Sequence, residues 1–421
     1  MTLATFKHVK ISAIETVVPE KEICIYDEVE YYGGSVKKID RMRKMVGFYK
    51  RHVADNETTP ADLAYDAAKN LISDINLDKN SIDALIFVVQ QPDVINPSTA
   101  YFIHDKLGLS DDCIATDINQ GCAGWVFGLY MASQMIESGT HKKILLLNGD
   151  TPSVGIDPSN RNAAPIFGDG GTATLLEYSE NEIVSQFAID TKSYGFEAIV
   201  SPFSGTRFRC DISKDEDFEF LAKTRNEKIM NPEGKEVPLL GGYMNGLAVF
   251  DFTIKVVPET IKKLLEYSKL TREQIPYLCL HQANKQIIQA VGSGAEFDLE
   301  KVPYQAFENY GNNTMCSIPT TIGLLPKDAP KKNLLCCGFG NGLISAAAIL
   351  NLENTFISDI KNFRKPEYVV SREQYVNTWR DKISGKISLS GGGGNRQDER
   401  TILLGSYGFV GPSQNNNYTQ K

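Results

Sequence analysis

The sequence lacks the marks of a secreted, membrane-spanning or metal-binding protein. No run approaches the roughly 20 apolar residues that cross a bilayer, and residues 1–10 are too polar for a signal peptide. The eight cysteines are scattered, with no C-x-x-C pair and no Cys/His cluster at the spacing of a zinc site. We therefore expect a cytoplasmic protein with reduced cysteines, no membrane span, no metal and no tightly bound cofactor.

An excess of positive charge is also missing. The chain has 44 Lys and Arg against 52 Asp and Glu, a formal net charge of −8. Nucleic-acid binding needs a basic face, so we expect no nucleic acid as a partner. With 421 residues, 42% of them hydrophobic, the chain can bury a large core in two domains or in one duplicated domain.

Strand-like apolar runs alternate with helical patterns through most of the chain, which predicts an α/β protein with buried sheets. The expected strands cover residues 84–89, 113–118, 144–147, 278–280 and 334–337. The expected helices cover residues 60–75, 99–107, 123–138, 248–268 and 284–291. We expect 113–118 to be a buried strand like the other four.

Two pairs of segments match each other across the chain. Residues 77–87 and 270–280 share their leucine and isoleucine spacing, and each predicts a helix end, a short turn and a buried strand. Phe167-Gly-Asp-Gly170 similarly matches Phe339-Gly-Asn-Gly342. Two matches in the same order indicate an internal duplication of roughly 170 to 190 residues. We therefore expect an N-terminal half at 1–180 and a C-terminal half at 181–353.

Residues 354–421 differ in character from both halves. Residues 371–374 predict the start of a short helix, with Tyr375, Trp379 and Ile383 on its apolar face. Four glycines at 391–394 and a polar end follow. We expect a polar C-terminal extension that is either a partner-binding arm or a disordered end.

Cys122 lies where an expected strand passes into an expected helix. Unpaired backbone N–H groups and the helix dipole favour an anion there, so we expect the thiol to ionise easily and to act as a nucleophile. Gly121 and Gly124 allow a tight backbone and leave room for a substrate. The alternative is a small buried core residue, which is the usual position of a free cysteine.

Three more polar segments follow apolar strands or lead into a helix. They are His281-Gln-Ala-Asn284, the Gly/Asn-rich loop at 309–319, and Gly338-Phe-Gly340-Asn-Gly342. Taken alone, each has an ordinary interpretation. The first is a structural histidine, the second a turn, and the third a glycine loop without the G-x-G-x-x-G spacing of a dinucleotide site.

Together with the Cys122 turn, these segments resemble the 3-oxoacyl-ACP synthase III family of thiolase-like condensing enzymes. The resemblance covers about residues 6–352, and segments 96–100, 157–161 and 167–170 also fit the family's motifs. It implies a thiolase-like, five-layered α-β-α-β-α fold with internal duplication, in agreement with the repeat found above. It also implies a homodimer joined through the central strands.

The resemblance assigns a role to each motif. Cys122 would be the acyl-accepting nucleophile, with His281 and Asn312 as the other catalytic residues. The backbone N–H groups of Cys122 and Asn341 would form the oxyanion hole of the acyl step. His281 Nε2 and the Asn312 amide would then bind the enolate oxygen that forms when a malonyl thioester loses carbon dioxide. The implied substrates are acyl-CoA or acyl-ACP and malonyl-ACP, and the implied partner is acyl carrier protein.

Other residues stand at the family's substrate-binding positions, where this chain partly differs. The positions that fit are Arg161, Phe167, Phe250 and Asn284. The family's adenine-binding W-x-x-x-R-T-G-I stretch is altered, because Arg41 and Met45 replace its Trp and Arg. We therefore expect a specialised member, serving a fatty-acyl, natural-product or polysaccharide pathway. The carrier protein is expected to meet basic residues at Lys37, Lys38, Arg43 and Lys44.

Two other functions stay open on the sequence alone. An acyl transferase would keep the acyl-Cys122 step but would pass the acyl group to an oxygen or nitrogen nucleophile without decarboxylation. A non-catalytic partner subunit would use the fold only to bind another synthase. The intact Cys, His and Asn disfavour the second alternative.

Overall fold

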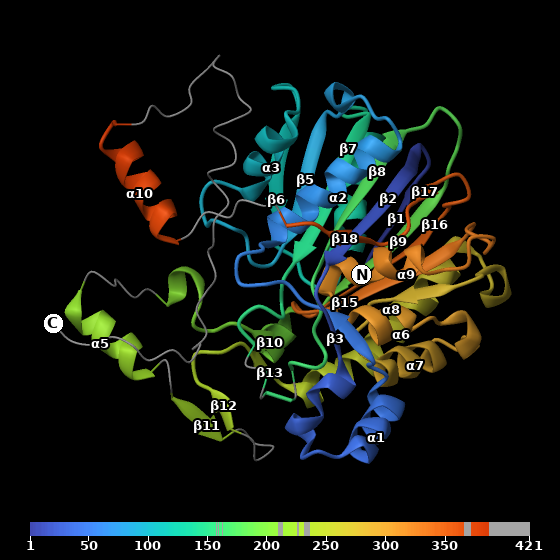
Figure 1. The fold of residues 1–421 in the computed structure, drawn as a ribbon. Coiled ribbons are helices and arrows are strands. Elements are labelled where there is room, and N and C mark those ends of the chain that lie inside the picture. The colour runs from blue at the N-terminus through green and yellow to red at the C-terminus, as the bar shows by residue number, and fades with distance from the viewer. Residues whose placement is uncertain are drawn as a thin grey trace.

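The structure is a computed structural model of the 421-residue chain (Figure 1). It describes residues 1–156, 158, 160–161, 163–208, 214–224, 227–230, 236–365 and 372–386. Two mixed sheets form its centre, and helices lie between them and on their outer faces.

The first sheet has the strand order β17-β2-β8-β7-β5-β6, with β18 also paired to β2. Its strands are β2 (Val9–Pro19), β5 (Ala84–Val89), β6 (Ile114–Ile118), β7 (Lys143–Asp150), β8 (Gly170–Tyr178), β17 (Phe356–Ile357) and β18 (Lys361–Phe363). The second sheet has the order β1-β9-β16-β15-β14. Its strands are β1 (Thr2–Phe6), β9 (Ser185–Thr191), β14 (Leu278–Leu280), β15 (Leu334–Gly340) and β16 (Ile344–Leu350).

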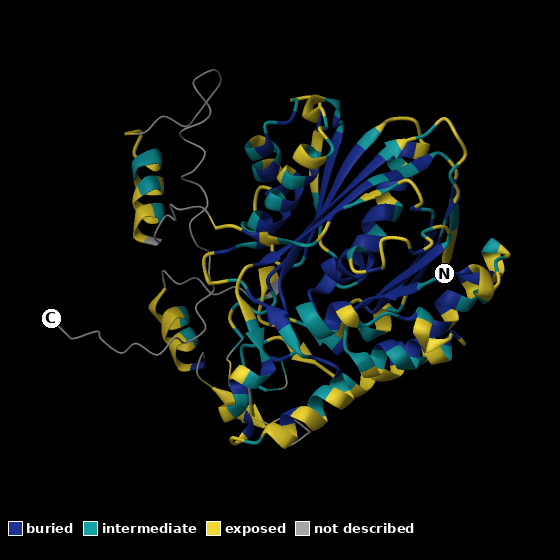
Figure 2. Ribbon diagram, turned by 45° about the vertical axis from the view of Figure 1, so that its right-hand side comes forward, coloured by how far each residue is buried: buried dark blue, intermediate teal, exposed yellow. Residues whose placement is uncertain are grey.

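Three apolar cores hold these elements together as five layers. The central core packs α4 (Gly124–Glu137) and α9 (Ser317–Gly323) between the two sheets. The outer face of the first sheet is covered by α2 (Pro60–Asp74) and α3 (Thr99–Leu107). The outer face of the second sheet is covered by α6 (Gly246–Ser268) and α7 (Lys285–Gly294). Figure 2 shows the result, with buried sheets inside and the exposed faces of the helices outside. The predicted five-layered fold is confirmed.

Smaller elements complete the described chain. The remaining helices are α1 (Val36–Val46), α5 (Asp215–Thr224), α8 (Gln305–Tyr310) and α10 (Arg372–Ile383). The short 3-10 helices are η1 (Ile25–Tyr32), η2 (Lys79–Ser81), η3 (Ser193–Ala198), η4 (Gly205–Arg207), η5 (Arg272–Gln274), η6 (Leu299–Lys301) and η7 (Thr314–Cys316). The short strands are β3 (Glu22–Cys24), β4 (Lys50–His52), β10 (Ile199–Val200), β11 (Lys228–Met230), β12 (Glu236–Pro238) and β13 (Tyr243–Met244).

Period-two alternation explains why the central strands are apolar throughout. In β5, Ile86 and Val88 face the central core, while Leu85 and Phe87 face the core under α2 and α3. Both faces of the strand are therefore buried, as expected of a strand inside a layered α/β fold. The neighbouring cysteines 336 and 337 likewise belong to opposite cores, which agrees with the absence of a disulfide among the described cysteines.

The connectivity of the sheets confirms the predicted duplication. The strands β2, β8, β7 and β5 are consecutive neighbours in one sheet, as β9, β16, β15 and β14 are in the other. In both sets the first two neighbouring pairs are antiparallel and the last pair is parallel. The two segments with matching leucine spacing contain η2 with β5 and η5 with β14.

One strand prediction is wrong in part. Residues 114–118 form β6, but this is an edge strand and not a buried one, because it pairs only with β5. Ile114 is accordingly 49% exposed. The apolar run on which the prediction rested does not reveal how many neighbours a strand has.

The start of the predicted extension lies inside the folded body. Within 354–421, β17 and β18 pair in parallel with β2, and Lys361 forms an ion pair with the buried Glu15. The predicted helix is present as α10, which stands apart from the two sheets in Figures 1 and 2. The glycines at 391–394 and the polar end lie outside the described residues. In the part of the chain that is described, every helix is too short or too polar to cross a membrane.

Candidate active site

Cys122 lies in the turn between β6 and α4, at the start of a central helix. Ala123 is the N-cap residue of α4, and the backbone N–H of Gly124 donates to the carbonyl of Gly121 across the turn (2.6 Å). The prediction of a strand-to-helix turn around Cys122 is therefore confirmed.

The glycine loop at the end of β15 packs directly against this turn. A Cβ added at Gly340 would lie 3.0 Å from Cys122 Cβ and 3.2 Å from its Sγ. A Cβ at Gly338 would lie 2.7 Å from Ala123 Cα. On the other side of the contact, a Cβ at Gly121 would lie 2.0 Å from Asn341 Oδ1. Glycine is required at 338, where a Cβ would meet backbone atoms, because any larger residue there would push the two segments apart.

The expectation that Cys122 ionises easily is wrong. Burial raises the pKa of the Cys122 thiol to about 12, and the nearby carboxylate of Asp150 adds to the rise. The resting group is therefore a neutral thiol, and it has to lose its proton during attack on a substrate.

His281 follows β14 and is 2% exposed. Its backbone N–H donates to Cys337 O (2.9 Å), and its ring stands edge-on to Phe339 with the centroids 5.4 Å apart. These contacts place the histidine beside β15, the strand that ends in the glycine loop.

Hydrogen bonds around Ser317 determine the tautomer of His281. The Ser317 hydroxyl donates to Thr314 O (2.7 Å), so its oxygen accepts the bond from His281 Nδ1 (2.9 Å). The proton of the neutral ring is then on Nδ1, and Nε2 carries the lone pair. Burial lowers the pKa of His281 to about 4, so the ring is neutral near pH 7 and Nε2 can accept a proton.

Asn312 is held by its backbone and by its side chain. It forms a bridge with Phe167, its N–H donates to Ile166 O (2.8 Å), and its carbonyl accepts from Gly168 N (3.2 Å). Its Oδ1 accepts a hydrogen bond from Thr314 N (3.0 Å). This bond leaves the Nδ2 group of Asn312 to donate to a ligand.

Sequence reasoning missed Thr314, whose backbone forms hydrogen bonds with Asn312 and with Ser317, the partner of His281. It has a φ of 51°, in the left-handed region that costs a β-branched residue on the order of 1–3 kcal/mol. Its N–H holds Asn312 and its carbonyl holds Ser317, the partner of His281. The only signal in the sequence was its place in the Gly/Asn-rich loop at 309–319.

Two further polar residues that the sequence did not single out are Asp150 and Gln90. Thr314 Oγ1 and Gln90 Nε2 each donate to Asp150 Oδ2 (2.7 Å for both bonds). Gln90 Oε1 in turn accepts from Asn341 Nδ2 (3.0 Å). A continuous chain of hydrogen bonds therefore runs from the glycine loop to the Asn312 loop. Asp150 is the polar last residue of the apolar strand β7, which was the available signal in the sequence.

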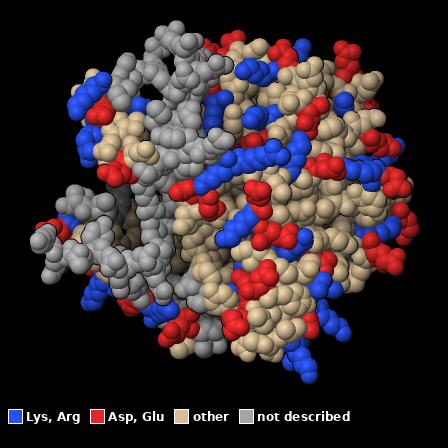
Figure 3. Space-filling view, viewed as in Figure 1, with Lys and Arg blue, Asp and Glu red and all other residues tan. Residues whose placement is uncertain are grey.

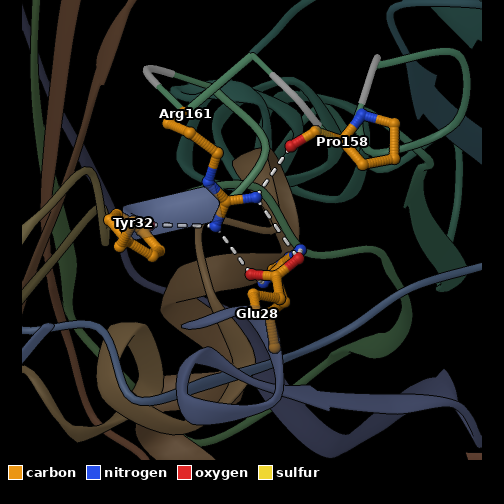
Figure 4. Close-up of polar contacts among 5 residues, drawn as sticks. Glu28, Tyr32, Pro158 and Arg161 are labelled. Atoms are coloured by element: carbon orange, nitrogen blue, oxygen red, sulfur yellow. Dashed lines mark hydrogen bonds and ion pairs between the residues drawn. The ribbon is translucent and has the colours of Figure 1, made fainter. Parts of the chain in front are cut away.

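Arg161 is engaged in a network of its own (Figure 4). Its guanidinium donates to Glu28 Oε2 (2.7 Å), Tyr32 Oη (2.9 Å) and Pro158 O (2.8 Å). Arg51 donates to the same carboxylate at 2.8 and 3.0 Å. Burial by itself would raise the pKa of Glu28, but the hydrogen bonds from the two arginines lower it below its usual value.

The other predicted substrate-binding residues lie on different elements. Phe167 pairs with Asn312, as described above. Phe250 is 43% exposed near the start of α6. Asn284 is the N-cap of α7, where its Oδ1 accepts from Ile287 N (2.9 Å). Asn284 thus orients the helix that follows His281.

A metal site does not emerge from the described residues, where no three or more His, Cys, Asp or Glu side chains gather. The groups that the candidate site offers to a substrate are a thiol, an imidazole, amides and backbone N–H groups.

On the surface, Lys and Arg side chains are interspersed with Asp and Glu side chains over the face seen in Figure 3.

Comparisons with known proteins find two matching family models and several relatives of this chain. The family described as 3-Oxoacyl-[acyl-carrier-protein (ACP)] synthase III matches residues 116–195, and the C-terminal part of the same family matches residues 265–352. A Campylobacter jejuni protein that carries the name 3-oxoacyl-[acyl-carrier-protein] synthase 3 is 36% identical over 364 residues, which cover 86% of this chain and 98% of that protein.

Two further relatives carry related names. A Streptococcus agalactiae beta-ketoacyl-[acyl-carrier-protein] synthase III is 32% identical over 74% of this chain and 90% of its own length. The crystal structure of a 3-oxoacyl-(acyl-carrier protein) synthase from Burkholderia xenovorans is 30% identical and superimposes with a TM-score of 0.75, covering 86% of this chain and 99% of that one.

Proposed function

The chain belongs to the 3-oxoacyl-[acyl-carrier-protein] synthase III family, and we propose that it joins an acyl group on Cys122 to a malonyl unit on acyl carrier protein. The reaction releases carbon dioxide and yields a 3-oxoacyl-ACP. One observation carries the proposal. The Cys122 turn packs against the glycine loop, and a hydrogen-bond chain joins this loop to the residues that hold Asn312 and His281.

In the first half-reaction, Cys122 Sγ attacks the carbonyl carbon of an acyl thioester. His281 Nε2 accepts the thiol proton, because the Nδ1 proton is committed to Ser317. The negative charge that forms on the carbonyl oxygen is stabilised by the backbone N–H groups of Cys122 and Asn341. The departing thiol takes the proton back, and the acyl group remains on Cys122.

In the second half-reaction, the malonyl thioester loses its carboxylate as carbon dioxide. His281 Nε2 first takes a proton from water. The electron pair of the broken C–C bond forms an enolate, whose oxygen accepts hydrogen bonds from Asn312 Nδ2 and from this Nε2–H group. The enolate carbon then attacks the acyl carbonyl, and the electron pair of the C–S bond returns to Cys122 Sγ, which takes up the proton from His281 Nε2. Deletion of such a donor typically lowers the rate by on the order of 100-fold or more.

The donor and the pathway are also part of the proposal. The Arg161 guanidinium is already bound by Glu28 and Tyr32, which supports a donor other than free coenzyme A. This in turn supports a specialised fatty-acyl, natural-product or polysaccharide pathway. Lys37, Lys38 and Lys44 of α1 are exposed and available to a carrier protein.

Arg43, the fourth of these basic residues, lines a cavity of about 260 Å³ with Lys44 and Lys285, although its charge is partly neutralised by Glu308 at 3.7 Å.

We further propose a homodimer, which the open edge of β6 supports. A cytoplasmic location is supported by the free state of the seven described cysteines.

Two measurements on the same protein test the function. The first is intact-mass analysis after incubation with a panel of acyl-CoAs and acyl-ACPs, which should reveal one acyl adduct that Cys122→Ala abolishes. The second is release of carbon dioxide from malonyl-ACP, which Asn312→Ala should lower by about 100-fold while the adduct still forms.

The two measurements also separate the alternatives. An adduct that moves to an alcohol or amine without carbon dioxide release would favour the acyl transferase. No adduct with any donor would contradict the catalytic proposal and would favour a non-catalytic partner subunit.

A further inference from the structure

We propose that Asp150 is the positioning residue of this active site, since it fixes both loops that carry the catalytic groups. The inference rests on the proposed function, because the groups that Asp150 positions are those assigned to the condensation. One arm of the network reaches Asn312 and His281 through Thr314. The other arm reaches the Cys122 turn through Gln90 and Asn341.

Asp150 is a buried acid held by hydrogen bonds alone. It is the last residue of β7 and is 2% exposed. Its carboxylate accepts from Thr314 Oγ1, from Gln90 Nε2 and from Thr151 N (2.7, 2.7 and 3.1 Å). Among the ion pairs of the described residues, none involves this carboxylate. A buried acid without a counter-ion depends on such donors, so their geometry is tightly determined.

The first arm depends on the backbone of Thr314. At a φ of 51° this residue is in a conformation that threonine rarely adopts, and its hydroxyl is tied to Asp150. In this conformation its N–H meets Asn312 Oδ1, and its carbonyl meets the Ser317 hydroxyl that holds His281 Nδ1. Without the bond to Asp150, the peptide groups on both sides of Thr314 can rotate, and Asn312 and His281 then lose their fixed orientations.

The second arm depends on the direction of two amide groups. A carboxylate only accepts hydrogen bonds, so the NH₂ group of Gln90 faces Asp150 and its oxygen faces Asn341. The NH₂ group of Asn341 then faces Gln90, and its oxygen packs against Gly121, the residue before Cys122. The charge of Asp150 thus determines how the glycine loop meets the nucleophile turn.

The kinetic test uses two substitutions at the bond between Thr314 and Asp150, of which Asp150→Asn also disturbs the bond from Gln90. Asp150→Asn keeps the shape of the side chain but introduces a donor, and Thr314→Val keeps its shape but removes the hydroxyl. We expect each to lower kcat for carbon dioxide release from malonyl-ACP by about 10- to 100-fold, with KM changed less than about threefold. Thr314→Ser keeps the hydroxyl and should retain more activity than Thr314→Val.

Two comparisons separate positioning from loss of fold. The double variant D150N/T314V should be no slower than the slower single variant, because both changes break the same bond. Glu15→Gln is the matched control, since Glu15 is another fully buried carboxylate of the first sheet, on β2. It should leave kcat unchanged, and all variants are checked by near-UV circular dichroism. Wild-type kcat in D150N and T314V, or strictly additive losses in the double variant, would overturn the proposal.

A spectroscopic readout keeps the test independent of the reaction. The chain has five histidines, so ¹⁵N-histidine labelling gives few signals, and His281→Gln assigns the one of interest. The His281 nitrogens should report an Nδ1–H tautomer in the wild type and should shift in D150N and T314V but not in E15Q. Unshifted signals in both variants would also overturn the proposal. A wild type that neither loads an acyl group nor releases carbon dioxide would instead contradict the proposed function.

Discussion

At Cys122, the helix N-terminus and burial act in opposite directions on the thiol. A helix dipole contributes about 0.3–1 kcal/mol at exposed sites and up to about 2 kcal/mol in partly buried ones. The rise of the pKa from 9.0 to about 12 corresponds to on the order of 4 kcal/mol. Burial therefore outweighs the dipole, and in the resting state both the Cys122 thiol and the His281 ring are neutral.

This balance predicts how Cys122 reacts with iodoacetamide in the absence of substrate. Only the thiolate reacts, so its alkylation rate should rise about tenfold per pH unit from pH 6 to pH 9, with no plateau. Peptide mass spectrometry after timed alkylation measures Cys122 separately from the other cysteines.

The matched control for this measurement is His281→Ala. Because the imidazole is neutral over this range, the variant should show the same pH dependence as the wild type. A plateau below pH 8 that disappears in His281→Ala would contradict the prediction, since it would indicate a thiolate–imidazolium pair.

Residue identities at the site followed from motifs, but their states did not. The motifs predicted Cys122 and the glycine loop as one site, and the structure places them in contact. The pKa of a thiol depends on how completely neighbours from distant segments exclude water, which a local sequence pattern does not contain. For the same reason the roles of Asp150 and Thr314 became visible only from their contacts.

At the scale of elements, the contact between β15 and α4 is the one on which the site depends. The backbone of Gly338 approaches the first turn of α4 so closely that a Cβ would lie 2.7 Å from Ala123 Cα and 3.0 Å from Cys122 O. Backbone atoms cannot rotate away from such a clash as a side chain can. The distance between strand and helix therefore depends on this glycine.

Gly338→Ala should consequently separate β15 from the start of α4. We expect acyl loading of Cys122 to slow by at least about 10-fold and the melting temperature to fall by several degrees, since overpacking in a core costs about 1–3 kcal/mol. Intact-mass time courses and thermal unfolding measure the two effects.

Gly323→Ala provides the control for this change. Gly323 is the last residue of α9, and a Cβ there would meet its neighbours at an ordinary 3.6 Å. This variant should load and melt like the wild type. Equal behaviour of the two alanine variants would show that the strand and the helix can adjust without affecting Cys122.

Elements were predictable from the sequence where one strong pattern determined them. The strands at 84–89 and 278–280 and the helix at 99–107 have the predicted bounds, because apolar runs and helical periodicity are local signals. The edge position of β6 was not predictable, since it depends on which strands lie beside it. The same holds for β17 and β18, whose short sequences become strands only by pairing with β2.

At the scale of the whole molecule, both ends of the described body cross between the predicted halves. β1 joins the sheet of the C-terminal half by pairing with β9, and β17 and β18 join the sheet of the N-terminal half. Lys365, just after β18, forms ion pairs with Asp55 and Glu57. The duplicated halves are therefore tied together by their termini as well as by the central core.

This arrangement predicts opposite outcomes for two truncations. A chain that ends at Lys365 keeps β17, β18 and both ion pairs of Lys365, so it should melt within a few degrees of the full chain and load Cys122 at the same rate. A chain that ends at Glu353 exposes one edge of β2 and leaves Glu15 buried without Lys361. At pH 8, where Glu15 is charged, it should lose up to about 3–5 kcal/mol of unfolding free energy, the typical effect of breaking a buried ion pair.

The effect of the shorter truncation should also depend on pH. Burial raises the pKa of Glu15 to about 7 even with Lys361 present, so folding favours its protonated form. The contribution of Glu15 to stability should therefore be greatest below pH 4.5 and should decline as the pH rises through 7, and the decline should extend to higher pH without the lysine. Lys361→Met in the full chain isolates this contribution from the loss of the strands. Urea unfolding at pH 5 and pH 8 measures the contribution of Lys361. If the chain that ends at Glu353 were as stable as the full chain at both pH values, the strands after residue 353 would be dispensable for stability.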